Sequence, residues 1–187
     1  MGNTASNVSA GKPNPTGAIH IAPKGTALPT STTAVLTGFS DLGYCSDDGL
    51  TNGTNLEVQK IKAWGGDTVL VIQSSKEDTF TFKLSEVKNV DVLKFVYGSS
   101  NVSGDLTTGL TMNVNNTDVE EVSIVIDMIR SDNTAQRIVI PTAKISEVSD
   151  IDYGDEEAVG YETTVECIPD ARGNTHYEYI LKSNVSA

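Results

Sequence analysis

The residues best suited to do chemistry in this sequence are two histidines and two cysteines, and their spacing matches no catalytic or metal-binding pattern. His20 lies inside an apolar run and His176 follows a turn, so each is expected to be a structural or surface histidine. Cys45 and Cys167 form no CxxC pair, and two cysteines do not make a disulfide framework. Because Cys167 shares a strand face with Tyr161, we expect it to be a buried, reduced thiol. The sequence predicts no catalytic residue, no metal ligand and no cofactor.

Two carboxylate-rich stretches could hold a cation. The stretch that starts at Asp48 begins like a calcium-binding loop. It lacks the carboxylates that such a loop needs at its third and twelfth positions, which are Leu50 and Gln59. The stretch DIDYGDEE (150–157) is dense in carboxylates, but a solvated acidic turn is the simpler interpretation.

The charge of the chain limits its partners. Lys and Arg number 13 against 25 Asp and Glu, which gives a net charge of −12. Phosphates repel such a chain, which argues against a protein that grips nucleic acid. The charge does not exclude a protein that lets DNA pass without binding it, although the simpler interpretation is that acidity keeps the chain soluble. No apolar run approaches the ~20 residues of a membrane-spanning helix, so no membrane anchor is expected.

Length and periodicity favour one mainly β domain. The 187 residues have the size of a single domain, and only 38% of them are hydrophobic. Many of the remaining residues are Thr, Ser, Asn and Gly, a mixture typical of strands and turns. Alternating apolar residues predict about eight to ten strands in a β-sandwich or barrel. The expected strands cover residues 16–23, 39–46, 68–74, 78–85, 109–115, 120–130, 134–141, 143–151, 158–168 and 176–181, with a hairpin turn at 75–77.

Three segments depart from the strand pattern. Residues 1–15 are polar and contain Gly and Pro, so we expect a flexible N-terminal arm that precedes a single domain over 16–187. Residues 47–67 are expected to form a long loop with some extended character, and loops of this length are usually functional or disordered. Residues 86–98 carry apolar side chains at helical spacing and end at Gly98, which predicts one helix that flanks the strands.

Several segments, taken in chain order, resemble one family of structural proteins. The strongest are KAWGGD (62–67), VDVLKFVYG (90–98) and NTHYEY (174–179), within a resemblance that runs from Thr16 to Leu181. Together they resemble the major tail tube protein of long-tailed, non-contractile bacteriophages. Because the pattern extends over the whole chain, it weighs more than any single motif.

The resemblance implies a structural virion protein without an active site. Members of the family form hexameric rings from a β-sandwich core with a flanking helix, and the rings stack into a tail tube. The implied partners are other copies of the chain, the tape-measure protein, the tail tip or baseplate and the tail terminator, with phage DNA passing through the lumen. The resemblance also implies assembly in the cytoplasm of the host bacterium, an inner β-barrel shared among subunits and a long inter-ring loop, here residues 47–67. Cys45 and the N-terminal arm are mild departures from the family pattern.

Trp64, the only tryptophan, lies where the expected loop rejoins the strand that starts at Thr68. Trp is enriched in interface hot spots, and Gly65 and Gly66 let the chain change direction. With Ile61, these three residues are our candidates for a subunit or ring interface. The alternative is that Trp64 packs on the core of its own subunit.

The negative charge has a use if the chain lines a DNA conduit. Asp127, Glu162 and Glu166 lie on polar faces of expected strands, and we hypothesise that they line the lumen and repel the DNA backbone. We also expect residues 1–15 and 47–67 to be mobile in the monomer and ordered in the tube, which would delay polymerisation.

Two other functions compete with this interpretation. A β-sandwich binding module, such as an adhesin or a carbohydrate-binding domain, would use a row of exposed aromatic residues, whereas the six Tyr and one Trp are scattered along the chain. A tube subunit of a contractile injection system would share the ring fold and would require a sheath partner.

Overall fold

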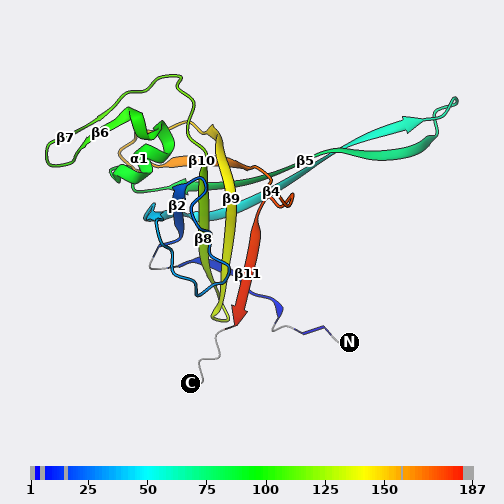
Figure 1. Ribbon diagram of the computed structural model, residues 1–187, viewed down its shortest axis with the longest axis horizontal. Helices are drawn as coiled ribbons and strands as arrows, with labels where there is room; N and C mark the ends of the chain where they lie inside the picture. Colours follow the sequence, from blue (N-terminus) through cyan, green and yellow to red (C-terminus); the bar gives the residue numbers. More distant parts are fainter. Residues whose placement is uncertain (1–2, 5–6, 15–16, 157, 183–187) are drawn as a thin grey trace.

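The structure is a computed structural model that describes residues 3–4, 7–14, 17–156 and 158–182. It is mainly β with one α-helix among these residues, so the predicted class is confirmed. Figure 1 shows a body of strands with the helix at one side and a long hairpin projecting from the other. The elements are β1 (Gly11–Pro13), β2 (Ile19–Pro23), β3 (Ser40–Asp41), β4 (Cys45–Lys62), β5 (Thr68–Leu84), α1 (Val90–Tyr97), a 3₁₀ turn (Ser99–Asn101), β6 (Val102–Asp105), β7 (Gly109–Met112), β8 (Val122–Arg130), β9 (Thr134–Val148), β10 (Tyr161–Cys167) and β11 (Tyr177–Lys182).

An antiparallel hairpin of β8 and β9 forms the centre of a nine-stranded sheet. Seven of its strands follow the order β3-β2-β8-β9-β10-β5-β4, and β1 and β11 pair beside this path with β8 and β9. On one side of this hairpin, β2 and β1 both pair with β8. On the other side, β11 pairs with the first half of β9 and β10 with its second half. The turn between β8 and β9 lies at residues 131–133, as predicted, and Asn133 adopts a φ of 62°, which Asn tolerates better than most residues.

Strand β9 is continuous over 15 residues, whereas the sequence predicted two strands separated near Pro141. The register between β8 and β9 shifts between Val122 and Ile124, next to this proline. Such a bulge accommodates a residue that has no N–H to donate to the ladder. The Pro141 carbonyl accepts a hydrogen bond of 2.8 Å from the buried Ser123 hydroxyl, so both groups are satisfied.

Helix α1 covers the sheet where β5 and β10 pair. The side chain of Asn89 accepts a hydrogen bond from the Asp91 N–H at 3.0 Å and caps the helix, so the helix predicted over 86–98 begins only at Val90. The rings of Phe95 and Phe82 stack with centroids 6.4 Å apart. The buried face of α1 therefore closes one side of the hydrophobic core.

The prediction of a long loop over 47–67 is wrong, because these residues form most of strand β4 and the turn that follows it. Strands β4 and β5 pair from Cys45 to the turn and back to Leu84, and the predicted turn at 75–77 lies inside β5. We call residues 54–77 the arm, since nearly all of them are exposed and they project beyond the sheet (Figure 1). Polar residues indicated a turn here, but a two-stranded ribbon with solvent on both faces tolerates polar residues along its length.

The N-terminal segment is only partly the free arm that the sequence predicts. Residues 11–13 form β1 and pair with residues 128–130 of β8. Residues 1–2, 5–6 and 15 of the predicted arm, and residues 16, 157 and 183–187 of the predicted domain, lie outside the described residues.

Candidate assembly surface

The arm is fixed to the body by a buried carboxylate at its root. Asp78 is 1% exposed, and one carboxylate oxygen accepts a hydrogen bond of 2.8 Å from the Asn52 side chain. The other oxygen accepts from the Thr175 hydroxyl at 2.5 Å and from His176 Nδ1 at 2.6 Å. His176 also packs edge-on against Phe80, with ring centroids 5.2 Å apart. His176 is therefore a structural histidine, as expected, and it ties the β10–β11 connection to both strands of the arm.

These contacts set the protonation of the root. Burial alone would raise the pKa of Asp78, because it disfavours the charged form. Hydrogen bonds from Thr175, Asn52 and His176 stabilise the carboxylate and outweigh burial, so the pKa of Asp78 is lowered. The root therefore holds a charged carboxylate at neutral pH. The sequence analysis did not single out Asp78, because its partners Asn52, Thr175 and His176 are distant in the chain.

The arm carries large apolar side chains on both of its faces. The register pairs Ile61 with Leu70, and alternation places Ile72 on their face. Val58 and Val71 lie on the opposite face. Each of these side chains is between 42% and 54% exposed, and Leu56 and Val69 are exposed as well. A concentration of exposed apolar residues of this kind marks an interaction surface in a soluble protein.

Trp64 occupies the tip of the arm. The turn is closed by hydrogen bonds from Ala63 N–H to the Asp67 carbonyl at 2.8 Å and from Gly66 N–H to the Ala63 carbonyl at 3.0 Å. Gly65 and Gly66 have φ values of 117° and 99°, which side chains strongly disfavour, so the two glycines make this turn possible. Trp64 is 106% exposed, so the alternative that it packs on its own core is wrong.

The sequence predicts Asp127 on an open, polar strand face, and this prediction is wrong. Asp127 is 9% exposed and forms a bidentate ion pair with Arg137 of β9, at 2.6 and 2.8 Å. The remaining nitrogen of Arg137 donates to the carbonyls of Ser31 and Ala34 at 3.0 and 2.7 Å. The segment between β2 and β3 thus covers this face of the central hairpin. Asp127 holds that cover in place and presents no free charge to a lumen.

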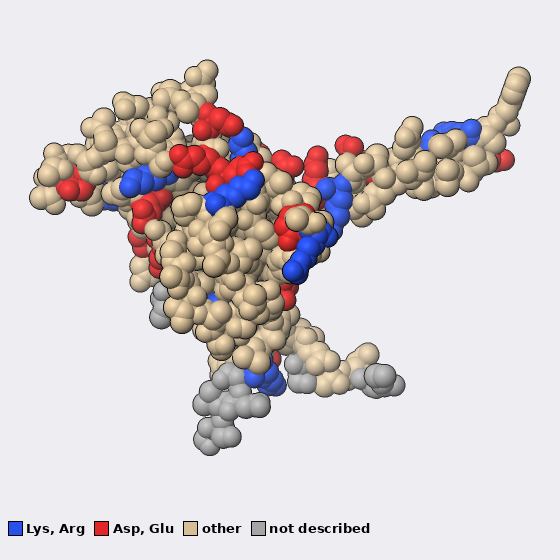
Figure 2. Space-filling model, in the orientation of Figure 1, with Lys and Arg blue, Asp and Glu red and all other residues tan. Residues whose placement is uncertain are grey.

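Glu162 and Glu166 do lie on the exposed face of β10. The register places Glu162 opposite Lys83 of β5 and Glu166 opposite Lys144 of β9. This face therefore alternates in charge and is not uniformly acidic. Figure 2 shows acidic and basic atoms mixed over the body in the same way, while most of the visible arm is uncharged.

The remaining candidates for chemistry are not assembled into a site. Both cysteines are free, and burial raises the pKa of Cys167 to about 12. Cys167 is 4% exposed, which confirms the predicted buried thiol. No group of three or more His, Cys, Asp or Glu side chains that could hold a metal ion occurs in the described part of the chain. Within the same residues, no helix combines the length and apolar character needed to span a bilayer.

Strand β11 offers a second surface for association. It pairs with β9 along one edge, and among the described residues no strand pairs with its other edge. Ile180 and Leu181 on this strand are 57% and 51% exposed. An unpaired edge of this kind is a template for a strand of another chain.

Comparison with known proteins decides the family. A family model described as "Phage tail tube protein" matches residues 2–187. The chain belongs to the phage tail tube protein family. The resemblance seen in the sequence is thereby confirmed, and a structural role in the phage tail follows from it.

Two further comparisons add little to the family assignment. None of the curated proteins compared with the chain matches it. Among solved structures, the chain is similar to the anti-feeding prophage cap, a tube-terminating cap solved by cryo-EM, with 10% identity and a TM-score of 0.42. That match covers 95% of this chain and 98% of the cap.

Proposed function

We propose that this tail tube protein forms hexameric rings that stack into the tube of a non-contractile phage tail, the conduit through which DNA enters the host. The observation that carries the proposal is the arm, which exposes apolar side chains on both faces and Trp64 at its tip. A ribbon that is apolar on both faces is suited to lie between two other surfaces. Contact with neighbouring subunits would remove these side chains from water.

Two kinds of contact are needed for a tube, and the chain has a surface for each. Within a ring, the open edge of β11 is suited to pair with an edge of the next subunit, which would close one barrel around the lumen. Between rings, the arm extends far enough to reach past its own subunit (Figure 1). The two surfaces lie on different elements, so ring closure and stacking can be altered separately.

The proposal includes the other components of a tail. The tape-measure protein would fill the lumen during assembly in the host cytoplasm, and the tail tip and terminator would bind the two open ends. DNA would later pass without specific contacts, which suits a chain of net charge −12. The unassembled arm, whose strands pair only with each other over residues 54–77, should exchange its amide hydrogens fast and become protected in the tube.

Negative-stain electron microscopy of the purified protein at rising concentration tests the proposed function. Stacked rings or hollow tubes with sixfold end views are the expected result. Particles that stay monomeric, both alone and after addition of tail tips with tape-measure protein, would contradict it.

A further inference from the structure

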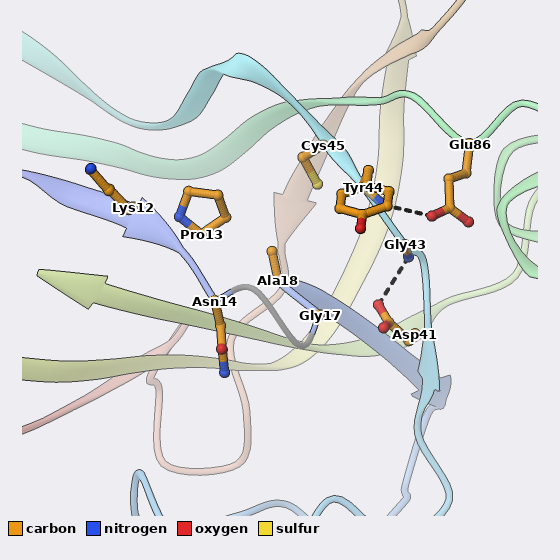
Figure 3. Close-up of a pocket in the computed structure, with 10 residues that line it drawn as sticks. All are labelled: Lys12, Pro13, Asn14, Gly17, Ala18, Asp41, Gly43, Tyr44, Cys45 and Glu86. Carbon is orange, nitrogen blue, oxygen red and sulfur yellow. Dashed lines mark hydrogen bonds between the residues drawn. The ribbon is translucent and has the colours of Figure 1, made fainter.

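A groove lies in the body of the protein, between β1 and the start of β4, at the end of β4 that is far from the arm tip. One hollow of about 490 Å³ is lined by residues that include Lys12, Asp41, Tyr44, Cys45 and Glu86. Figure 3 shows these side chains around a shared space, with β1 on one side and the segment that enters β4 on the other. A second hollow, of about 240 Å³, adjoins the first along Lys12, Pro13, Ala18 and Cys45.

The floor of the groove is apolar and its rim is acidic. The second hollow reaches the core residues Ile19, Phe82 and Ile126. Asp41 and Glu86 lie at the rim of the first hollow, where they accept hydrogen bonds from the N–H groups of Gly43 and Tyr44 at 2.9 and 3.0 Å. Both carboxylates are held in place by the backbone, and Lys12 is the single basic residue among the described residues that line the first hollow.

The far end of the arm has the complementary character. Residues 58–72 include Lys60, Lys62 and Asp67 as their only charged residues, a net charge of +1 in a chain of −12. Figure 2 shows a basic patch near the end of the arm. At the tip, Trp64 offers a large apolar ring, of a type that removes about 150–250 Å² from water when buried. An apolar ring preceded by two lysines fits a groove with an apolar floor and two carboxylates at its rim.

The arm cannot fill the groove of its own subunit. The groove includes Cys45, the first residue of β4, and the tip follows Lys62, its last residue. Eighteen extended residues at ~3.3 Å each separate the two by roughly 55 Å. Any arm tip that enters the groove therefore comes from another copy.

We propose that the groove between β1 and β4 receives the Trp64 tip of an arm from a second copy of this chain. The inference rests on the proposed function and names the receiving surface for the arm. Because donor and receiver are opposite ends of the same strand, the contact is head-to-tail and can repeat without limit. Each copy would receive one tip and donate one, and the repeat between linked copies would be no longer than strand β4, roughly 55 Å.

Cross-linking with a short bismaleimide tests this contact. The test protein carries Ala63→Cys at the tip and Tyr44→Cys at the groove, in a Cys45→Ala background. Tyr44 is 75% exposed, so its replacement does not disturb the core. The matched control moves the second thiol from Tyr44 to Tyr153, which is 80% exposed and does not line the groove. The expected result is a ladder of covalent multimers in the test protein that is at least tenfold weaker in the control.

A mixture of two proteins, each with one exposed engineered thiol besides the buried Cys167, sharpens the result. When one protein carries the tip thiol and the other the groove thiol as its one exposed thiol, the head-to-tail contact predicts heterodimers and no longer products. A ladder in the control equal to that of the test protein would overturn the inference.

Electron microscopy of the same samples, alone and after addition of tail tips with tape-measure protein, separates the two proposals. Tubes without a ladder would overturn the groove contact and leave the tail tube proposal intact. A ladder without tubes would support the contact and overturn the proposed assembly. Samples with neither tubes nor ladder would overturn both. As a second readout, emission of Trp64, the only tryptophan, should shift to shorter wavelength on assembly, and unchanged emission in tubes would contradict burial of the tip.

Discussion

At the scale of single residues, the contacts of a carboxylate decide what it does, and the sequence does not reveal them. Asp127, Glu162 and Glu166 look alike in an alternating pattern. The structure buries Asp127 against Arg137 and leaves the two glutamates on an exposed face. The difference comes from the segment between β2 and β3, which covers one side of the central hairpin through contacts distant in sequence. Local periodicity contains no information about such a cover.

The Asp127–Arg137 pair should stabilise the fold of each subunit. Asp127→Asn leaves the buried guanidinium without its counter-charge, and breaking a buried pair costs about 3–5 kcal/mol of unfolding free energy. Urea denaturation of the unassembled protein measures this loss. Glu166→Gln on the exposed face is the control and should change stability by less than about 0.5 kcal/mol. Equal stability of the two variants would show that the pair does not hold the cover.

Asp78 should make the arm root sensitive to acid. Its pKa is lowered in the folded protein, relative to about 3.9 for an unfolded chain. The charged carboxylate therefore contributes stability that is fully present above pH ~4 and is lost as the pH falls through the folded pKa. Asp78→Asn should be less stable than the wild type at pH 6, and the difference should shrink at pH 3. A difference in unfolding free energy that is the same at both pH values would contradict this role.

At the scale of elements, the sequence predicts best where packing agrees with local pattern. The helix near residues 90–97 and strand β10 have clear periodicity, and both form close to their predicted positions. The arm was misjudged because it has no buried face. The returning strand over 68–74 was predicted, whereas the outgoing strand over 54–62 was read as loop, because it is polar and is held only by its partner strand and by the root at Asp78. Pro141 led to the wrong prediction of two strands in place of β9. The bulge that accommodates this proline forms only when β9 pairs with β8, so the local sequence does not reveal it.

The apolar faces of the arm should matter for assembly and little for folding. Leu70→Ser/Ile72→Ser removes two side chains that are 50% and 43% exposed, so unfolding of the monomer should be nearly unchanged. Tube formation should be lost or require at least tenfold more protein, because the buried contact between subunits is weakened. Light scattering against concentration measures this change. Gln59→Ser/Gln73→Ser on the same ribbon is the control, and equal impairment by both pairs would contradict a specific role of the apolar faces.

At the scale of the whole molecule, the mainly β class and the family could be recognised from the sequence, whereas the shape could not. The sheet order depends on pairings such as β10 with β5, which join residues far apart in the chain. The projecting arm and the groove between β1 and the start of β4 arise from these pairings. The interface candidates Ile61, Trp64, Gly65 and Gly66 all lie on the arm or at its tip, and their contact with another subunit remains a prediction.

Two glutamates on β10 should affect passage of DNA if their face lines the lumen. Glu162→Gln/Glu166→Gln leaves Lys83 and Lys144 opposite neutral residues, so the face becomes two charges more positive than in the wild type. The DNA backbone would then bind this face, and ejection from assembled phage should slow, most strongly at low salt, where charges are least screened. Glu120→Gln/Glu121→Gln, which precedes β8, is the charge-matched control. An ejection rate that is unchanged at every salt concentration would show that these glutamates do not repel DNA.

The central claim is that copies of this chain join through the arm to build a tube. The most direct test compares wild-type protein with a variant in which residues 57–74 are replaced by a short turn, both viewed by negative-stain electron microscopy after addition of tail tips and tape-measure protein. The root at Asp78 and the core are retained, so the variant should fold and remain monomeric or form single rings. Wild-type protein should form stacked rings. Tubes of normal length from the shortened variant would contradict the claim.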